Sequence, residues 1–316
     1  MNKKKVLIVG LGKIGLHYDI NNSDNFKLSH ANSFFSHNFF DLKGAVDKKK
    51  NNLKLFKKKY NLPCFLNIKK ALTFIRPNVV VVATPSRDHF TVIKKIFTYS
   101  RPELILCEKP LSDNFDDALN IYNLCKVNNS KLLVNYSRRY DNYLFKIKNI
   151  LKKISSNKIF CNVYYSKGIL TNGSHFLNLS EYLFGKLIKV KILKKKRLHK
   201  DFAINFYAEF KGAGINFINT ENIFSSNFFE VFSDRFLIRV TYNEVYYYKI
   251  KKNKLMDKFN LLDDKRNILF KINPRLVNFN VINEISKLLK GQKAFVCEGK
   301  EALTTMKNLK FIINHE

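Results

Sequence analysis

Short apolar runs alternate with helical patterns over the first 136 residues. Five short runs are rich in apolar residues, as buried strands are: residues 5–9, 41–46, 79–83, 103–107 and 131–135. Three segments between them carry apolar residues three and four positions apart, which predicts helices over 51–60, 89–99 and 115–128. Apolar strands separated by helices indicate a parallel sheet covered on both faces. We therefore predict a Rossmann-like, doubly wound α/β domain.

The pattern changes after a helical segment at 140–154. Short aromatic-rich runs, separated by turn residues, then predict a large, open and mostly antiparallel sheet. These runs are 158–165, 187–193, 205–210, 214–220, 228–233, 236–241 and 244–250. Helical patterns return at 281–289 and 301–313. We predict an α/β domain over 1–136 and an α+β domain over 137–316, with the helix at about 300–314 packing back toward the first.

Composition narrows the class of protein. The 316 residues are 46% hydrophobic, enough for two domains, and no run approaches the eighteen apolar residues of a membrane span. The opening MNKKKVLIVG has too short an apolar part for a signal peptide, so we interpret it as a first strand. Five widely spaced cysteines without a CxxC pair predict neither a metal site nor a disulfide framework. We expect a reducing, cytoplasmic location.

The net charge of +32 raises the possibility of nucleic-acid binding. The lysines are spread along the chain in short clusters, such as 48–50, 57–59 and 194–196, instead of forming one basic stretch. That distribution favours solvated faces over a phosphate-binding stripe. We therefore expect no specific nucleic-acid partner and no membrane partner; the nucleic-acid alternative rests on net charge alone.

A glycine motif follows the first strand directly. In Gly10-Leu11-Gly12-Lys13-Ile14-Gly15, the first glycine permits a tight turn. The second lets the backbone approach a pyrophosphate, and the third lets helix and strand pack closely. A helix opening here would offer its N–H groups to the phosphates. This context predicts a dinucleotide cofactor.

Asp47 ends the second strand, where the acidic partner of a dinucleotide ribose is expected. A carboxylate there accepts from the ribose hydroxyls and repels a 2′-phosphate, so NAD is favoured. The positive charges of Lys48–Lys50 would offset this repulsion, so NADP is retained as the alternative cofactor. Asp47 lies farther along the chain than usual, and we assign the excess to a polar loop, Tyr18–Leu28, inserted in the first crossover. That loop is either a substrate cover or a plain surface insertion.

Three further segments follow predicted strands, where ligands bind in open α/β sheets. They are ATPSRDH (83–89), CEKP (107–110) and VNYSRRY (134–140). Each alone also fits an ordinary turn, a surface ion pair or a solvated helix start. In this order after a glycine motif and a strand-end Asp, however, they resemble the Gfo/Idh/MocA family of nicotinamide-dependent oxidoreductases. KGILTNGSHF (167–176) extends the resemblance into the second domain.

The resemblance implies roles for individual residues. Lys109 of EKP would stand beside the nicotinamide and His175 would act on the reacting hydroxyl or carbonyl. The implied cofactor contacts are Gly10, Gly12, Lys13, Ile14, Gly15, Asp47, Thr84, Pro85, His89, Glu108, Lys109 and Asn135. The implied substrate contacts are Lys109, Arg139, Tyr140, Lys167, Thr171, Asn172 and His175. The implied substrate is a sugar, a polyol or a nucleotide-linked sugar, and the implied assembly is a homodimer or homotetramer.

One position departs from the family pattern. Many members carry Asp four residues before the active-site histidine, whereas Thr171 stands there. Threonine cannot stabilise an imidazolium as a carboxylate does. Because Lys109 and His175 are both present, we favour an active dehydrogenase, with a non-catalytic dinucleotide-binding sensor or partner protein as the alternative. Oxidising an alcohol needs a hydride acceptor and a base, and we expect His175 to move the proton and Lys109 to position and polarise the oxygen.

Overall fold

The computed structural model describes residues 3–22, 25–154, 159–221, 223, 227–252, 260–263, 265 and 267–315. The chain forms two compact units. Unit 1 comprises Met1–Asp141 and Arg275–Lys307, and unit 2 comprises Asn142–Pro274 and Asn308–Glu316. This division differs from the predicted one, which gave everything after residue 136 to the second domain. The returning segment closes unit 1 through long-range contacts, which periodicity along the chain does not reveal.

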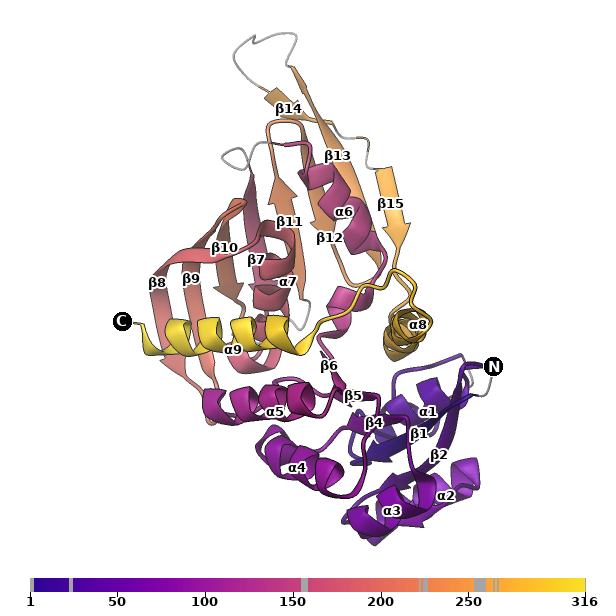
Figure 1. Cartoon of the computed structure of the whole chain (residues 1–316). Coiled ribbons are helices and arrows are strands. Elements are labelled where there is room, and N and C mark those ends of the chain that lie inside the picture. Colours follow the sequence, from indigo (N-terminus) through magenta and orange to yellow (C-terminus); the bar gives the residue numbers. More distant parts are fainter. Residues whose placement is uncertain are drawn as a thin grey trace. The chain divides into compact units, whose positions relative to one another are not determined.

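Unit 1 is built on a six-stranded parallel sheet in the order β3-β2-β1-β4-β5-β6 (Figure 1). Its strands are β1 (Lys4–Val9), β2 (Phe40–Val46), β3 (Cys64–Phe65), β4 (Val79–Val82), β5 (Leu104–Cys107) and β6 (Lys131–Val134). All four valines of β4 are fully buried, because helices cover both faces of the sheet. The strand order reverses between β1 and β4, which is where an open α/β sheet binds ligands.

The helices of unit 1 are α1 (His30–Phe35), α2 (Lys50–Tyr60), α3 (Ile68–Ile75), α4 (His89–Tyr99), α5 (Phe115–Val127) and α8 (Val277–Leu289). Helices α3, α4 and α5 pack side by side, and α1 packs on α8. Glu298 pairs with Leu133 of β6, just before α9 (Gly299–Asn314), and the boundary between the units falls within α9. The carboxyl ends of β1, β4, β5 and β6 therefore rest on a well-packed scaffold.

Unit 2 is built on a nine-stranded sheet in the order β14-β13-β12-β11-β7-β10-β9-β8, with β15 paired to β13. Its strands are β7 (Phe160–Tyr165), β8 (Leu187–Arg197), β9 (Phe202–Phe210), β10 (Ala213–Asn219), β11 (Phe228–Phe232), β12 (Phe236–Val240), β13 (Glu244–Lys252), β14 (Asn260–Leu262) and β15 (Asn267–Lys271). All pairings are antiparallel except that of β7 with β10.

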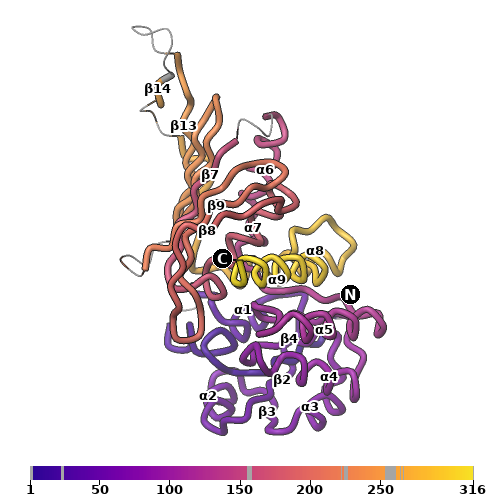
Figure 2. Tube along the Cα trace, turned by 90° about the vertical axis from the view of Figure 1, so that its left-hand side faces the viewer, coloured from indigo at the N-terminus to yellow at the C-terminus, as the bar shows by residue number. Residues whose placement is uncertain are grey.

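One face of this sheet carries helices α6 (Tyr143–Leu151) and α7 (Ser174–Phe184), as both views of the chain show (Figures 1 and 2). Residues of β10 alternate strictly between buried and half-buried, so the sheet has one packed face and one more open face. The predicted fold class is confirmed. Sequence patterns missed β3, α3, β14 and β15, which are only two, eight, three and five residues long.

Candidate active site

The glycine motif forms the turn after β1. Gly10 has a φ of +100°, and a Cβ there would lie 2.6 Å from the carbonyl oxygen of Ala83 at the end of β4. A Cβ at Gly15 would overlap the Gly10 carbonyl, whereas one at Gly12 would meet no atom within 4 Å. The first and third glycines therefore serve packing within the turn. Gly12 leaves open space beside the backbone, as the approach of a pyrophosphate requires.

The helix predicted to open at this turn is interrupted. Leu16 N–H donates to Gly12 O at 2.9 Å, but the chain then enters a short 3₁₀ helix at His17–Asp19. The helical hydrogen bonds resume when His30 N–H donates to Ile14 O at 2.9 Å and Ala31 N–H to Gly15 O at 3.1 Å. In each of these two bonds the donor and acceptor are sixteen residues apart, whereas in an uninterrupted α-helix they are four residues apart. The segment is thus one helix with twelve extra residues looped out, which accounts for the late position of Asp47.

The looped-out segment is tied at its base. The Asp19 carboxylate, which is buried, accepts from Leu28 N–H at 2.7 Å and Ser29 N–H at 3.0 Å. Ser29 in turn caps α1 by accepting from Asn32 N–H at 3.2 Å. The α2 residue Lys59 donates to two carbonyl oxygens of the segment. These bonds fix where the loop leaves and re-enters the helix. Two residues of the predicted Tyr18–Leu28 insertion, 23 and 24, lie outside the described part of the chain.

Asp47 lies at the end of β2 beside the glycine turn, as predicted. Its Oδ2 accepts from Leu11 N–H at 2.7 Å and its Oδ1 from Lys49 N–H at 2.7 Å. Each carboxylate oxygen keeps a further lone pair for another donor. Asp47 therefore shapes the turn and presents a negative charge next to it, at the strand end where a ribose-binding acid is expected in a dinucleotide-binding fold.

A buried polar network supports the end of β5. Glu108 Oε1 accepts from His30 Nε2 of α1 at 2.7 Å and from Asn135 Nδ2, after β6, at 2.7 Å. Asn135 Nδ2 also contacts Asn278 Oδ1 of α8 at 3.3 Å. Burial alone would raise the pKa of Glu108, but the bonds and charges of His30, Asn135 and Lys109 outweigh it and hold that pKa below its ordinary value. Glu108 is thus an anion, and it fixes the backbone from which the half-buried Lys109 projects.

His89 connects two of the predicted loops. Its ring is fully buried, with Nε2 2.9 Å from Thr84 O and Nδ1 3.1 Å from Leu111 O. Cys107 Sγ lies 3.2 Å from the same Nδ1, and burial raises the pKa of that thiol well above its ordinary value. His89 therefore joins the loop after β4 to the segment after Lys109-Pro110 through backbone contacts. This bridging place differs from the direct cofactor contact predicted for it.

Three buried polar atoms at this edge of the sheet have no hydrogen-bond partner among the described residues. They are Thr84 Oγ1, Asn135 Oδ1 and His30 Nδ1. Buried polar groups are normally satisfied, so orphaned atoms gathered around strand ends indicate where a polar ligand completes the structure. Together with the open space at Gly12 and the charge of Asp47, these residues fit an NAD molecule laid across the ends of β1, β4 and β6.

Arg139 and Tyr140 are buried inside unit 1, each with at most 3% of its surface exposed. Arg139 donates to Glu301 Oε1 at 2.8 Å and to Val296 O at 3.1 Å. Tyr140 donates to Val134 O at 3.1 Å. This placement differs from the predicted contact with substrate, because both side chains bind the unit's own groups. The sequence showed two polar residues after a strand, but it did not show the segment around residue 300 that covers them.

The remaining predicted residues lie in unit 2, between β7 and the first turn of α7. Lys167 is exposed, and a one-turn π-helix at Ile169–Gly173 leads directly into α7. His175 is the second residue of α7. Its side chain is half-buried, and its Nδ1 atom is shielded from solvent. Asn172 Nδ2 donates to Ser166 Oγ at 3.2 Å. Thr171 binds the carboxylate of Asp201, a residue that no sequence motif marked.

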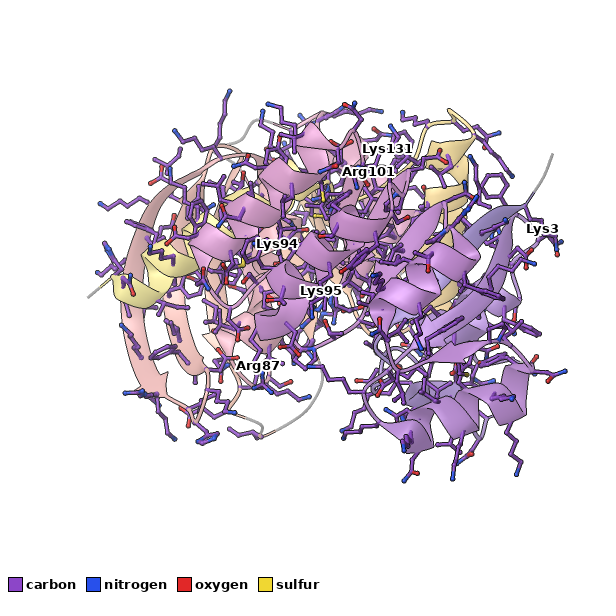
Figure 3. All side chains as sticks on the ribbon, turned by 60° about the horizontal axis from the view of Figure 1, so that its bottom comes forward. Lys3, Arg87, Lys94, Lys95, Arg101 and Lys131 are labelled. Atoms are coloured by element: carbon purple, nitrogen blue, oxygen red, sulfur yellow. The ribbon has the colours of Figure 1, made fainter. Side chains whose placement is uncertain are left out.

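The basic residues of unit 1 come from many elements. Six exposed examples are labelled in Figure 3: Lys3, Arg87, Lys94, Lys95, Arg101 and Lys131. Within the described residues, no group of three or more His, Cys, Asp or Glu side chains is arranged to hold a metal ion. No helix among them is both long and apolar enough to cross a membrane.

Comparison with known proteins gives a family match for residues 4–136 and a fold for the whole chain. Residues 4–136 match the model of the Gfo/Idh/MocA family, described as an oxidoreductase family with an NAD-binding Rossmann fold. No curated protein sequence matches the chain.

Several solved structures share the fold. UDP-N-acetylglucosamine 3-dehydrogenase GnnA from Acidithiobacillus ferrooxidans is 13% identical with a TM-score of 0.76, over 99% of this chain and 97% of that one. The WlbA dehydrogenase from Bordetella pertussis, solved with NADH and UDP-GlcNAcA, is 15% identical with a TM-score of 0.74, over 99% and 95%. Aldose-aldose oxidoreductase from Caulobacter crescentus, solved with glycerol, is 15% identical with a TM-score of 0.77, over 99% and 97%.

Proposed function

Because residues 4–136 match the model of the Gfo/Idh/MocA family of NAD-binding oxidoreductases, we propose that the chain transfers a hydride between NAD and a CH–OH carbon. The substrate we propose is a sugar, a polyol or a nucleotide-linked sugar. The observation that carries the proposal is the row of orphaned buried polar atoms along the strand ends, beside the open turn at Gly12.

The residues of unit 1 divide the binding of the cofactor between them. The turn at Gly12 takes the pyrophosphate, and Asp47 accepts from the ribose hydroxyls and disfavours a 2′-phosphate. Thr84 Oγ1 and Asn135 Oδ1 are a hydroxyl and an amide oxygen without partners in the described residues, suited to a carboxamide and a ribose. When bound, the nicotinamide accepts or returns the hydride.

We assign Lys109 and His175 to proton transfer and charge stabilisation at the reacting oxygen of the substrate. In the oxidising direction the substrate would lose a hydride from its C–H bond, which NAD would accept when bound, and its O–H proton would leave to a base. We assign that proton to His175 Nε2, since Nδ1 is buried. The Lys109 ammonium, held by the backbone next to Glu108, orients the oxygen and stabilises negative charge on it. In the reducing direction the same groups return the proton.

The class of substrate is supported by the structural relatives. Two are a UDP-N-acetylglucosamine dehydrogenase and a dehydrogenase solved with UDP-GlcNAcA, and a third is an aldose oxidoreductase. The net charge of +32 suits an anionic, nucleotide-linked sugar, since it raises the local concentration of anions.

The test follows reduced-cofactor absorbance with purified protein, NAD or NADP, and a panel of free and nucleotide-linked sugars. We expect Lys109→Ala and His175→Ala each to lower kcat/KM by about 10²-fold or more, as loss of an acid–base or electrostatic group does. The exposed Lys94→Ala and His199→Ala are matched controls, expected to retain activity. Cofactor binding with no turnover on any sugar would favour the non-catalytic alternative. Absence of cofactor binding would refute both.

A further inference from the structure

We propose that Asp201 is a positioning residue for His175 that provides the negative charge missing at Thr171. Its carboxylate comes from the turn between β8 and β9 and enters the first turn of the helical segment that carries His175. This inference rests on the proposed function, because it assigns Asp201 to the proton transfer made by His175.

The contacts of Asp201 are unusually complete. Its Oδ1 accepts from Leu170 N–H at 2.9 Å and from Phe202 N–H at 2.7 Å. Its Oδ2 accepts from Thr171 N–H at 2.9 Å and from Thr171 Oγ1–H at 2.8 Å. Four donors surround one carboxylate, two of them backbone N–H groups at the start of a helix, where an anion is most stable.

The chain makes room for this carboxylate. A Cβ at Gly168 would overlap the Asp201 carboxyl group, so only glycine at 168 allows the side chain to enter. Lys167, just before it, adopts a φ of +61°, which turns the backbone into the helical segment. On the other side, Leu198 N–H donates to Asp201 O at 2.8 Å and closes the β8–β9 turn. Both sides of the contact are therefore fixed.

The turn transmits this position to His175. Asn172 N–H donates to Gly168 O at 2.9 Å, and Ser174 Oγ donates to Leu170 O at 2.8 Å. These bonds connect the residues held by Asp201 directly to the first residue of α7. Thr171 and His175 are four residues apart, so the helical segment places them on the same side. Asp201 Oδ2, bonded to Thr171, therefore stands on the side of the segment that carries His175.

The physical consequence is a division of one role between two residues. Thr171 contributes a hydroxyl and an N–H but no charge, and Asp201 contributes the charge through them. A carboxylate bonded to the first turn of the helical segment that carries His175 opposes the positive helix end and favours the imidazolium that forms when His175 takes the substrate proton. Removing the charge should therefore lower kcat more than it changes KM for NAD.

The test separates charge from helix capping. Asp201→Asn is expected to lower kcat at least tenfold and to leave KM for NAD within threefold. Adding Thr171→Asp to Asp201→Asn is expected to return kcat to within threefold of the native enzyme. Adding Thr171→Asn instead, which can cap the helix without a charge, is expected not to do so. Thermal unfolding of each variant is recorded alongside.

Native kcat in Asp201→Asn, or equal rescue by Thr171→Asp and Thr171→Asn, would overturn the assignment. Loss of kcat that neither second change restores would also overturn it. If Asp201→Asn does not fold, Asp201→Glu and Asp201→Gln give the same comparison between charged and uncharged side chains of one size. Loss of turnover in His175→Ala, with native kcat in Asp201→Asn, refutes only the role of Asp201. Native turnover in His175→Ala refutes the role of His175 and with it that of Asp201, whereas absence of turnover in the native protein on every sugar refutes the proposed function itself.

Discussion

Asp141, the last residue of the first segment of unit 1, lowers the free energy of unfolding by an amount that depends on pH. Burial raises its pKa from 3.8 to about 6, against the opposing effects of the hydrogen bond from Asn280 Nδ2 at 3.1 Å and the charge of Arg138. The folded chain therefore binds this proton more tightly than the unfolded chain does. Stability is unaffected below the unfolded pKa and falls as pH rises from about 4 to above 6.

The size of this effect follows from the shift. Raising the pKa by roughly two units corresponds to about 3 kcal/mol, at 1.36 kcal/mol per unit. We expect Asp141→Asn to match the native protein near pH 4 and to exceed its unfolding free energy by up to about 3 kcal/mol at pH 7.5. The amide oxygen keeps the bond from Asn280, so the packing is retained.

The assay is urea unfolding followed by circular dichroism between pH 4 and 8, comparing the midpoints of the native protein and the variant. Asp116→Asn is the matched control, since Asp116 is exposed in the first turn of α5, where losing the charge costs about 0.3–1 kcal/mol. A difference between Asp141→Asn and native protein that does not change with pH would refute the reasoning. So would a variant that is less stable than the native protein at pH 7.5.

Three further predictions concern the strand ends of unit 1 where we propose that the cofactor binds. Gly12→Ala should fold normally, because the added Cβ meets no protein atom, but NADH affinity measured by titration should fall about tenfold, because the Cβ occupies the space proposed for the pyrophosphate. Gly15→Ala should instead lower the unfolding free energy by about 1–3 kcal/mol, because its Cβ would overlap the Gly10 carbonyl. Asp47→Asn should shift the ratio of NADH to NADPH affinity about tenfold toward NADPH; an unchanged ratio would contradict the role given to the carboxylate. Glu108→Gln should cost about 1–3 kcal/mol at pH 7, and this difference should shrink as pH falls below 4.5, because a carboxylate whose pKa is lowered stabilises the fold only while ionised.

The sequence predicts the parts of this fold that depend on local pattern. Fully buried strands such as β4 are continuous apolar runs, and α4 begins and ends at the residues where its periodicity does. The Rossmann-like sheet, the antiparallel second sheet and the glycine turn follow from these signals. The sequence does not show that a late segment of the chain returns to pack in the first unit. Helix α8 and the segment near residue 300 join unit 1 after more than 130 intervening residues.

The same limit applies to the site. Gly12 and Asp47 stand beside their strand ends because a motif fixes them locally. Asp201 and His30 matter because the fold brings them to Thr171 and Glu108 from thirty and seventy-eight residues away, and no spacing rule predicts such contacts. Arg139 follows a strand end as cofactor and substrate residues do, but Glu301 turns it inward.

The interrupted helix after the glycine turn has a consequence for how this chain tolerates change. The backbone leaves the helix near His17 and re-enters at His30, and the hydrogen bonds of His30 and Ala31 to Ile14 and Gly15 bridge the gap as if nothing lay between. The exit and entry points are thus neighbours in space, so the number of residues between them is independent of the helix geometry. This makes the position a natural graft site: the stretch between the tied ends at Asp19 and Leu28 should tolerate shortening, lengthening or exchange for a foreign loop without moving the glycine turn.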